Sequence, residues 1–426
     1  MCRFRAERSR VASACATFLI VAAIGCVAGP RASLDDIARQ YVRLAVALGE
    51  RDPDSLDFYA GPDEEVADVR KNPPPLAAIQ RDAEALAARL AREPIGSADV
   101  PRVRALTADL HAIVARVDLL TGTKRPFDRE SLAFFGVVPA PIDDRRLEPV
   151  RSAIAGQVGG RGRLVDRYVA FAGRFVVPGE RLPAVMQAAI DECRRRTIAH
   201  VALPAGEQVT LAFVRDKPWS AFSRYTGDGR SVMQVNTDFQ FTVDQALQVA
   251  CHEAYPGHHT RNSVLAPRRD ARGRPPERSV QLLFTHEALA SEASAMLASE
   301  VAFSADQRIA FLRDRLFPLA GLDPAGAARH AEVERLVGDL QIAQVAIARR
   351  YLDGELEFAR AVTALEDLAL VPHADALVKY LNQYRTYLTT YTVGRQRLAA
   401  RFAACAGADP ADTVRWRCFE NVTSPR

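Results

Sequence analysis

The sequence has no strong excess of charge, no repeat at a fixed period and no low-complexity tail. Its 426 residues carry a formal net charge of +4. Most of that excess lies in the first 25 residues, where Arg3, Arg5, Arg8 and Arg10 outnumber Glu7. The remaining chain is close to neutral, which gives no electrostatic reason to expect DNA or RNA binding. With 48% hydrophobic residues, the chain can bury a large core as one big domain or two lobes.

A membrane-spanning run is also missing. The apolar stretch 11–25 follows the basic N-terminus but is too short for a transmembrane helix, and Pro30 comes soon after it. This layout predicts a signal peptide over residues 1–26. Its end is similar to a lipoprotein cleavage box, so we expect Cys26 to carry a lipid, with ordinary signal cleavage as the alternative. Either way we expect an exported protein of the periplasm or cell envelope, held at the membrane only through that lipid.

Cysteine is scarce, and the cysteines that follow the signal peptide bear on which disulfides can form. Of the seven cysteines, four follow Cys26 in the sequence. In an oxidising compartment Cys405 and Cys418 could close a small loop near the C-terminus. Cys251 lies beside a group of histidines, but its side chain would point away from theirs on a helix. We therefore expect Cys251 to be a small buried residue.

Three of the eight histidines fall within the stretch 252–259, and Glu253 follows the first of them. Two histidines and a carboxylate are the usual parts of a zinc hydrolase site. The common form is H-E-x-x-H, in which a spacing of four places both imidazoles on one helix face. Here His258 and His259 lie six and seven residues after His252. On an unbroken helix they would be about 9 and 10.5 Å away along the axis, too far to share one ion.

The sequence supplies an interruption between these histidines. Pro256 blocks a helical hydrogen bond, and Gly257 permits backbone angles that other residues avoid. We therefore expect the helix to bulge for about one turn and to bring the next histidine back beside His252. Spacing alone does not choose between His258 and His259 as the second ligand.

The box HEAYPGHH at 252–259 resembles the signature of the bacterial family known as domain of unknown function 885. That box is similar to the HExGH of the mostly helical zinc peptidases. The resemblance implies one zinc ion, His252 and His258 as ligands, and Glu253 as general base. His259 would then support the ligands or contact substrate. The family's third ligand is the first glutamate of the motif EGWAxYxE, which Glu287 matches.

The chain departs from that motif after Glu287, at Ala288, Leu289, Glu292 and Ser294. Glu292 lies roughly 140° around the helix from Glu287, so we expect it to be an orienting or surface residue.

Two flanking stretches extend the resemblance. Val235-Asn236-Thr237 is similar to the family's strand end before the metal helix, which makes Asn236 a candidate for supporting the site or binding substrate. The stretch from Tyr391 to Arg395 is similar to its C-terminal Y-x-x-G-R. We expect the Tyr391 hydroxyl to stabilise a tetrahedral oxyanion and Arg395 to hold a peptide carboxylate. The competing tyrosines are Tyr255, Tyr384 and Tyr387.

Outside this box the chain mostly has the apolar spacing of α-helices. Strand signals are confined to 208–214, 221–225 and 231–236, and the last two flank a Gly-rich turn that predicts a hairpin. We therefore expect a mainly α, metallopeptidase-like fold with a small sheet before the metal-binding helix. We expect an N-terminal helical lobe at 33–202, a catalytic lobe at 203–404, and a C-terminal tail at 405–426.

The sequence thus predicts an exported zinc metallopeptidase that hydrolyses peptide bonds with Glu253 as general base. One alternative is a non-catalytic envelope lipoprotein that keeps the metal helix, which the departures at Ala288 and Leu289 favour. Another is a zinc hydrolase of a non-peptide amide. The sequence does not indicate an oligomeric state.

Overall fold

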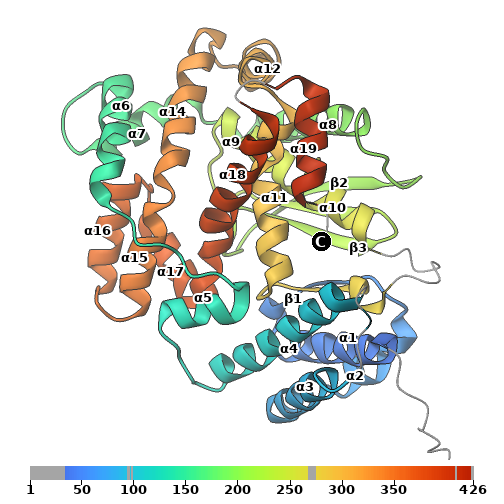
Figure 1. Cartoon of the computed structure of the whole chain (residues 1–426). Helices are drawn as coiled ribbons and strands as arrows, with labels where there is room; N and C mark the ends of the chain where they lie inside the picture. The colour runs from blue at the N-terminus through green and yellow to red at the C-terminus, as the bar shows by residue number, and fades with distance from the viewer. Residues whose placement is uncertain (1–33, 94–95, 97–98, 267–274, 408–409, 424–426) are drawn as a thin grey trace, which may run out of the picture.

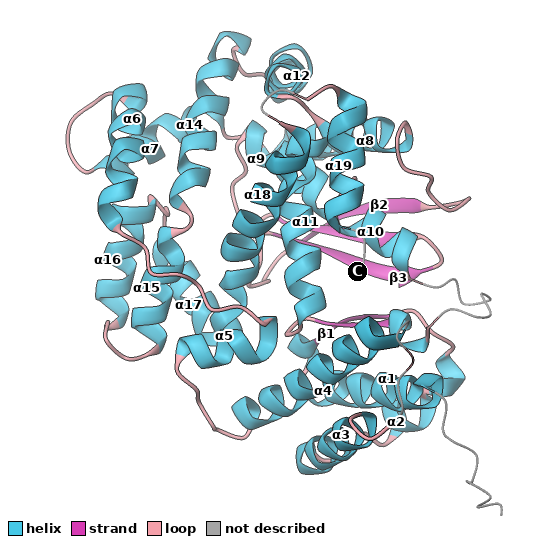
Figure 2. Ribbon diagram, in the orientation of Figure 1, coloured by secondary structure: helices cyan, strands magenta, loops and turns pink. Residues whose placement is uncertain are grey.

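The computed structural model describes residues 34–93, 96, 99–266, 275–407 and 410–423 (Figure 1). The predicted signal peptide and Cys26 lie outside the described residues. Helices dominate the molecule and the strands form small sheets, so the fold is mainly α, as predicted (Figure 2). In the part of the chain that is described, no helix is both long and apolar enough to cross a membrane.

The N-terminal part is a group of helices that lies below the rest of the molecule in Figure 1. Its helices are α1 (Leu34–Arg51), α2 (Ala67–Lys71), α3 (Leu76–Leu90) and α4 (Val100–Leu120). Apolar residues at helical spacing, such as Ile37, Tyr41, Ala45 and Leu48 of α1, are buried in a core shared by α1, α3 and α4. This group therefore has a core of its own.

A second, larger set of helices surrounds the candidate site. The helices that follow α4 are α5 (Phe127–Phe135), α6 (Glu148–Val158), α7 (Leu164–Ala172), α8 (Leu182–Ile198), α9 (Val243–Glu253), α10 (His258–Leu265), α11 (His286–Ala302), α12 (Ala305–Phe311), α13 (Phe317–Ala320), α14 (Ala327–Leu340), α15 (Ala343–Leu352), α16 (Phe358–Ala369), α17 (Ala374–Tyr384), α18 (Arg395–Ala406) and α19 (Asp412–Thr423). Helices α6 to α8 share one buried core with α9, α11 and α14. This core crosses the boundary predicted between residues 202 and 203.

The predicted sheet is present. Strands β2 (Gln208–Val214), β3 (Ala221–Gly227) and β4 (Arg230–Asn236) lie in the order β2-β4-β3. Strands β3 and β4 form the expected antiparallel hairpin, and β2 pairs with β4 in parallel. The inward residues of β4 alternate along the strand, as a half-buried sheet requires.

A second, two-stranded sheet was not predicted. Strand β1 (Leu56–Tyr59) pairs with β5 (Val280–Leu282) in antiparallel fashion, although more than 200 residues separate them. Phe58 of β1 packs edge-on against Tyr225 of β3, with ring centroids 5.2 Å apart. This contact brings the N-terminal group of helices up to the main sheet.

Helix α9 lies at the centre of the larger core. Thr242 and Gln245 form a capping box at its start, which satisfies two backbone amides that the helix leaves free. Helices α8, α11 and α14 pack around it, and Ala246, Leu247 and Ala250 are fully buried between them. The histidine box therefore follows a rigid, well-packed helix.

The described part of the chain contains two disulfides. Cys405 and Cys418 are bonded, which joins α18 to α19 as the sequence suggested. Cys251 was expected to be a small buried residue. It is buried, but it forms a disulfide with Cys193 of α8, 58 residues earlier. Neither spacing nor motif pairs these two residues, because only the packing of α8 on α9 brings them together.

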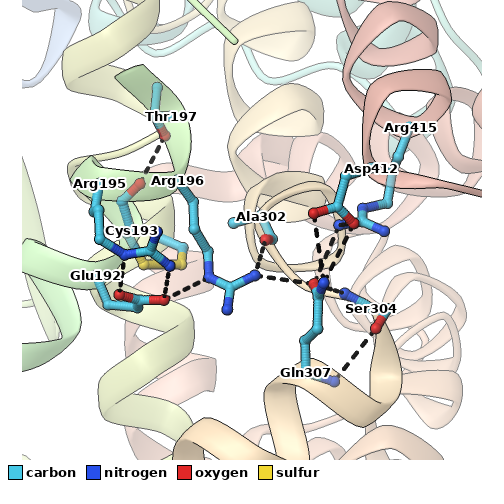
Figure 3. A network of polar contacts seen from close by, with 11 residues as sticks. Glu192, Cys193, Arg195, Arg196, Thr197, Ala302, Ser304, Gln307, Asp412 and Arg415 are labelled. Atoms are coloured by element: carbon cyan, nitrogen blue, oxygen red, sulfur yellow. Dashed lines mark hydrogen bonds and ion pairs between the residues drawn. A yellow bond between two sulfur atoms is a disulfide. The ribbon is translucent and has the colours of Figure 1, made fainter. Parts of the chain in front are cut away.

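The C-terminal segment is a docked helix (Figure 3). The Arg415 guanidinium of α19 is buried; it donates to the carbonyl of Val301 at 2.8 Å and pairs with Asp412 at 2.8 Å. The side chain of Gln307 donates to Asp412 at 3.3 Å and accepts from Arg196 of α8 at 2.9 Å. Helix α19 is thus tied through α12 to α8, the helix that carries Cys193.

Candidate metal centre

The interruption expected at Pro256 and Gly257 is present. Helix α9 ends at Glu253, and α10 begins at His258. The Tyr255–Pro256 peptide bond is cis, and the Gly257 amide donates to the carbonyl of Cys251 at 3.0 Å. The chain therefore breaks completely into two helices, where the sequence suggested a bulge within one.

This break brings His258 back beside His252. Their Nε2 atoms lie 3.1 Å apart, and the two rings meet edge to face with centroids 4.7 Å apart. His259 points elsewhere. Its ring is fully buried, with Nδ1 2.8 Å from the Ser231 hydroxyl and Nε2 2.9 Å from Glu207. Hence His258 joins His252, while His259 fastens α10 to the sheet and is too buried to touch substrate.

The third member of the group is Glu292 of α11. Its Oε2 lies 3.3 Å from His252 Nε2 and 3.4 Å from His258 Nε2. In the described part of the chain these are the residues whose ligand atoms are close enough together to hold a metal ion. Glu287, the ligand expected from the resemblance, is not in the group. Its carboxylate pairs with Arg261, and Arg278 lies 3.9 Å away.

The group fits a zinc ion. Two ligand atoms at about 2.0–2.1 Å from a tetrahedral ion are about 3.3–3.4 Å apart, which is close to all three separations between His252, His258 and Glu292. Glu292 Oε2 is buried and accepts no hydrogen bond from the described residues. Such an orphaned carboxylate oxygen is costly unless a cation completes its environment.

Neighbouring side chains fix the orientation of this group. The Tyr387 hydroxyl donates to Glu292 Oε1 at 2.9 Å, which leaves Oε2 directed at the imidazoles. His258 Nδ1 lies 3.1 Å from the Ser291 hydroxyl. Partners of this kind hold metal ligands in the productive rotamer and tautomer. From the sequence, Tyr387 was expected only as a competitor of Tyr391 for the donor to the oxyanion.

The electrostatics of the group are those of tightly paired opposite charges. Burial opposes ionisation of Glu292, but His258 and His252 outweigh it and hold the pKa of that carboxyl well below its usual range. Burial likewise disfavours the charged form of His258, but the carboxylates of Glu292, Glu253 and Asp57 raise its pKa to about 9. The site is thus built to hold positive charge.

Glu253 lies at the edge of this group. Its Oε1 is 4.0 Å from His252 Nε2, so it is adjacent to the three atoms without being one of them. The backbone amide of Ser223 in β3 donates to its carboxylate. Burial raises the pKa of Glu253, although His252 and His258 oppose the shift. A carboxylate with a raised pKa beside the group is suited to accept a proton.

Two other residues predicted to act at the site, Asn236 and Arg395, lie away from the group of His252, His258 and Glu292. Asn236 is fully buried and donates to the carbonyls of Lys217 and Trp219 at 3.0 and 3.1 Å, so it shapes the loop before β3 and does not reach the site. Arg395 pairs with Glu300 at 2.5 Å, which already neutralises its charge. Its expected role in holding a substrate carboxylate has no support from this arrangement.

Tyr391 is nearer to the site. Its hydroxyl donates to Tyr380, and burial together with the charge of Glu292 raises its pKa well above the ordinary value. Its ring packs edge-on to Tyr387 at 5.6 Å between centroids. It therefore belongs to the tyrosine group behind Glu292.

The sequence did not identify Glu292 as the third ligand, because the family motif can be aligned in two ways. Both Glu287 and Glu292 are followed three residues later by an alanine, Ala290 or Ala295, so EGWA can be placed on either glutamate. The two side chains point in different directions around α11, and only one can face the histidines. The basic neighbours of Glu287, Arg261 and Arg278, are brought to it by the fold and give no local signal.

Comparison with known proteins does not identify a function. No family model and no curated protein matches the sequence. Among solved structures, the chain is similar to an M32 carboxypeptidase from Deinococcus radiodurans R1, with 15% identity over 90% of this chain and 88% of that one, and a TM-score of 0.49. It is also similar to a candidate lipoprotein from Colwellia psychrerythraea (13% identity, 84% and 72% covered, TM-score 0.46) and to another of unknown function from Shewanella oneidensis (12%, 93% and 80%, 0.41). The case for a function therefore comes from the side chains.

Proposed function

We propose that this protein is an exported zinc metallopeptidase that hydrolyses peptide bonds. The observation that supports this is the convergence of two imidazole nitrogens and one carboxylate oxygen, with Glu253 beside them. His252, His258 and Glu292 would hold the ion through three positions and leave a fourth open, as in catalytic zinc sites. Zinc bound there would polarise the scissile carbonyl and lower the pKa of a bound water toward about 7.

Glu253 would act as general base. It would accept a proton from the attacking water and then donate it to the leaving amine. The Ser223 amide holds the Glu253 carboxylate in place, and the raised pKa of Glu253 favours proton uptake. Tyr391 is the proposed donor to the oxyanion, for which its hydroxyl would exchange Tyr380 for the substrate oxygen.

The sheet offers a place for the substrate backbone. Strand β3 is at one edge of the order β2-β4-β3, and it is the strand that contacts Glu253. An extended peptide can add to such an edge through main-chain hydrogen bonds. The Ser223 hydroxyl is buried and has no hydrogen-bond partner among the described residues, so it is available to a bound chain.

Export is part of the same proposal. Two disulfides are present, and disulfides persist mainly in oxidising compartments. The lipid at Cys26 is proposed from the sequence alone. Metabolic labelling with palmitate, which Cys26→Ala should abolish, would test it.

The decisive experiment is digestion of a mixed peptide library by the zinc-loaded full chain, read by mass spectrometry, with Glu253→Gln as the control. We expect cleavage that disappears in the variant and on chelation. A protein that binds one zinc but shows no Glu253-dependent turnover would contradict the proposal and favour a non-catalytic metal-binding lipoprotein. Cleavage confined to non-peptide amides added to the library would support a different hydrolase.

A further inference from the structure

The Tyr387 hydroxyl that fixes Glu292 comes from a short helical segment whose first residue has an unusual backbone conformation. Helix α17 ends at Tyr384, and Arg385 begins the segment η10 (Arg385–Tyr387). Arg385 has φ 49° and ψ −116°, a positive φ that favours glycine and strains a residue with a side chain. Because this reversal lies two residues before Tyr387, it sets where the Tyr387 side chain points.

Glu130 of α5 holds Arg385 in this conformation. Arg385 Nε donates to Glu130 Oε2 at 2.7 Å, and the Thr386 hydroxyl donates to Glu130 Oε1 at 3.0 Å. Each oxygen of one carboxylate thus binds one of two consecutive residues of η10. All three residues are buried. Removing one partner of such a shielded ion pair leaves the other charge uncompensated, so the pair resists disruption.

Helix α5 also packs against the aromatic ring of Tyr387. The ring of Phe135, the last residue of α5, meets the Tyr387 ring edge to face with centroids 5.9 Å apart. The Phe284 ring meets it in the same way at 5.8 Å. Close packing on two sides restricts the rotamers that the Tyr387 side chain can adopt. Helix α5 therefore fixes the Tyr387 hydroxyl both through the backbone of η10 and through the ring.

These contacts form a continuous path from α5 to the metal centre. Glu130 binds Arg385 and Thr386, and the next residue, Tyr387, donates to Glu292 Oε1 at 2.9 Å. The other oxygen of Glu292 faces the two imidazoles at 3.3 and 3.4 Å. Every residue on this path is at most 8% exposed. In an interior packed this closely, a displacement of the turn is passed on to the side chains it supports.

We propose that Glu130 is a positioning residue of the metal centre, which acts on Glu292 through Arg385 and Tyr387 without being a ligand itself. This inference rests on the zinc centre of the proposed function and deepens it. Without the Glu130 carboxylate, the strained turn at Arg385 relaxes and the Tyr387 hydroxyl moves away from Glu292. The Glu292 carboxylate is then free to rotate, and the three ligand atoms no longer converge.

A double-mutant cycle on zinc affinity tests the inference without turnover. The full chain, Glu130→Gln, Tyr387→Phe and the variant with both changes are titrated with zinc against a competing chelator. We expect each single change to weaken zinc binding about tenfold or more, and the double variant to bind no more weakly than the weaker single one. Independent effects multiply, so a double loss equal to the product of the single losses would overturn the inference. Unchanged zinc affinity in Glu130→Gln would also overturn it.

A milder variant keeps the test informative if Glu130→Gln does not fold. Thr386→Val keeps the shape of the side chain and removes only the hydroxyl that donates to Glu130. It should weaken zinc binding in the unmodified protein but cause no further loss in Tyr387→Phe. Cobalt(II) in place of zinc gives a second measurement, because its visible absorption depends on the geometry of the ligands. A spectrum shifted by Tyr387→Phe but not by Thr386→Val would contradict the proposed path.

The control for general destabilisation is Asp244→Asn. Asp244 is fully buried and forms an ion pair with Arg308, but it lies in the first turn of α9, about 12 Å along the axis from His252. This variant should be less stable and keep its zinc affinity. An equal loss of zinc affinity in Asp244→Asn and Glu130→Gln would overturn the inference. Peptide cleavage is measured separately: coupled zinc losses without any cleavage would refute only the peptidase function, and cleavage with multiplied zinc losses would refute only the role of Glu130.

Discussion

A Cβ atom on Gly257 would lie 1.8 Å from the carbonyl oxygen of His252 and 2.5 Å from that of Cys251. Any other residue must therefore push apart the break that brings His258 beside His252. We expect Gly257→Ala to lower zinc affinity at least a hundredfold and to destabilise the fold by about 2 kcal/mol or more. Zinc titration against a competing chelator and thermal unfolding would measure the two effects.

Gly338 of α14 provides the matched control. A Cβ there meets no atom within 4 Å, and alanine is favoured over glycine inside a helix by about 0.5–1 kcal/mol. Gly338→Ala should therefore keep full zinc binding and unfold at the same or a slightly higher temperature. Equal zinc affinity in both variants would refute the role assigned to the break.

The two glutamates of α11 should behave differently. Glu292→Gln removes the buried oxygen that faces both imidazoles, so we expect the bound zinc to fall from one equivalent to little or none under competition with a chelator. Glu287→Gln disrupts an ion pair with Arg261 instead and should retain one equivalent. If Glu287→Gln loses the metal and Glu292→Gln retains it, Glu287 is the third ligand, as the family resemblance implied.

A structural feature could be predicted from the sequence when the interactions that produce it lie within a few residues of one another. The hairpin β3–β4 and the break at Pro256-Gly257 are encoded within a few residues, and both were predictable. The identity of the third carboxylate depends on which face of α11 meets α9 and α10, and no local pattern specifies that. The same holds for the pairing of β1 with β5, which joins segments more than 200 residues apart in the sequence.

The Cys193–Cys251 disulfide closes a long loop beside the first histidine of the box, and it should support the fold. A loop of 58 residues corresponds to about 4 kcal/mol in the chain-entropy treatment. We expect Cys193→Ala with Cys251→Ala to lower the unfolding free energy by roughly 2–4 kcal/mol in denaturant titrations. The Cys405–Cys418 disulfide closes a shorter loop, of 13 residues. Replacing both of its cysteines with alanine should therefore lower the unfolding free energy less, by about 3 kcal/mol at most. A larger loss in the second pair would contradict this order.

Because of the buried carboxyl of Glu334 in α14, the free energy of unfolding should fall as the pH rises. Burial, with the charge of Asp244 on α9, raises its pKa from 4.5 to about 8, although the Tyr168 hydroxyl of α7 and Arg308 of α12 oppose the shift. The folded protein therefore keeps a proton that the unfolded chain has lost, so raising the pH favours unfolding until the folded pKa is passed. The Nδ1 of His330 lies 3.9 Å from the Glu334 Oε1, and burial lowers the pKa of His330 from 6.5 to about 4, so this ring is neutral in the folded protein above pH 6.5.

Between pH 6.5 and about 8, comparison with Glu334→Gln isolates Glu334, because the other titrating groups contribute equally to both proteins. We expect the unfolding free energy to fall there by about 2 kcal/mol more in the unmodified protein than in Glu334→Gln, measured by urea titration at each pH. The amide can still accept from Tyr168, so the variant should fold. Glu332→Gln is the control, because that exposed carboxylate pairs with Arg335 and its pKa is lowered; it is ionised in both states throughout this window. Parallel pH profiles for Glu334→Gln and the unmodified protein would show that the buried carboxyl does not retain its proton.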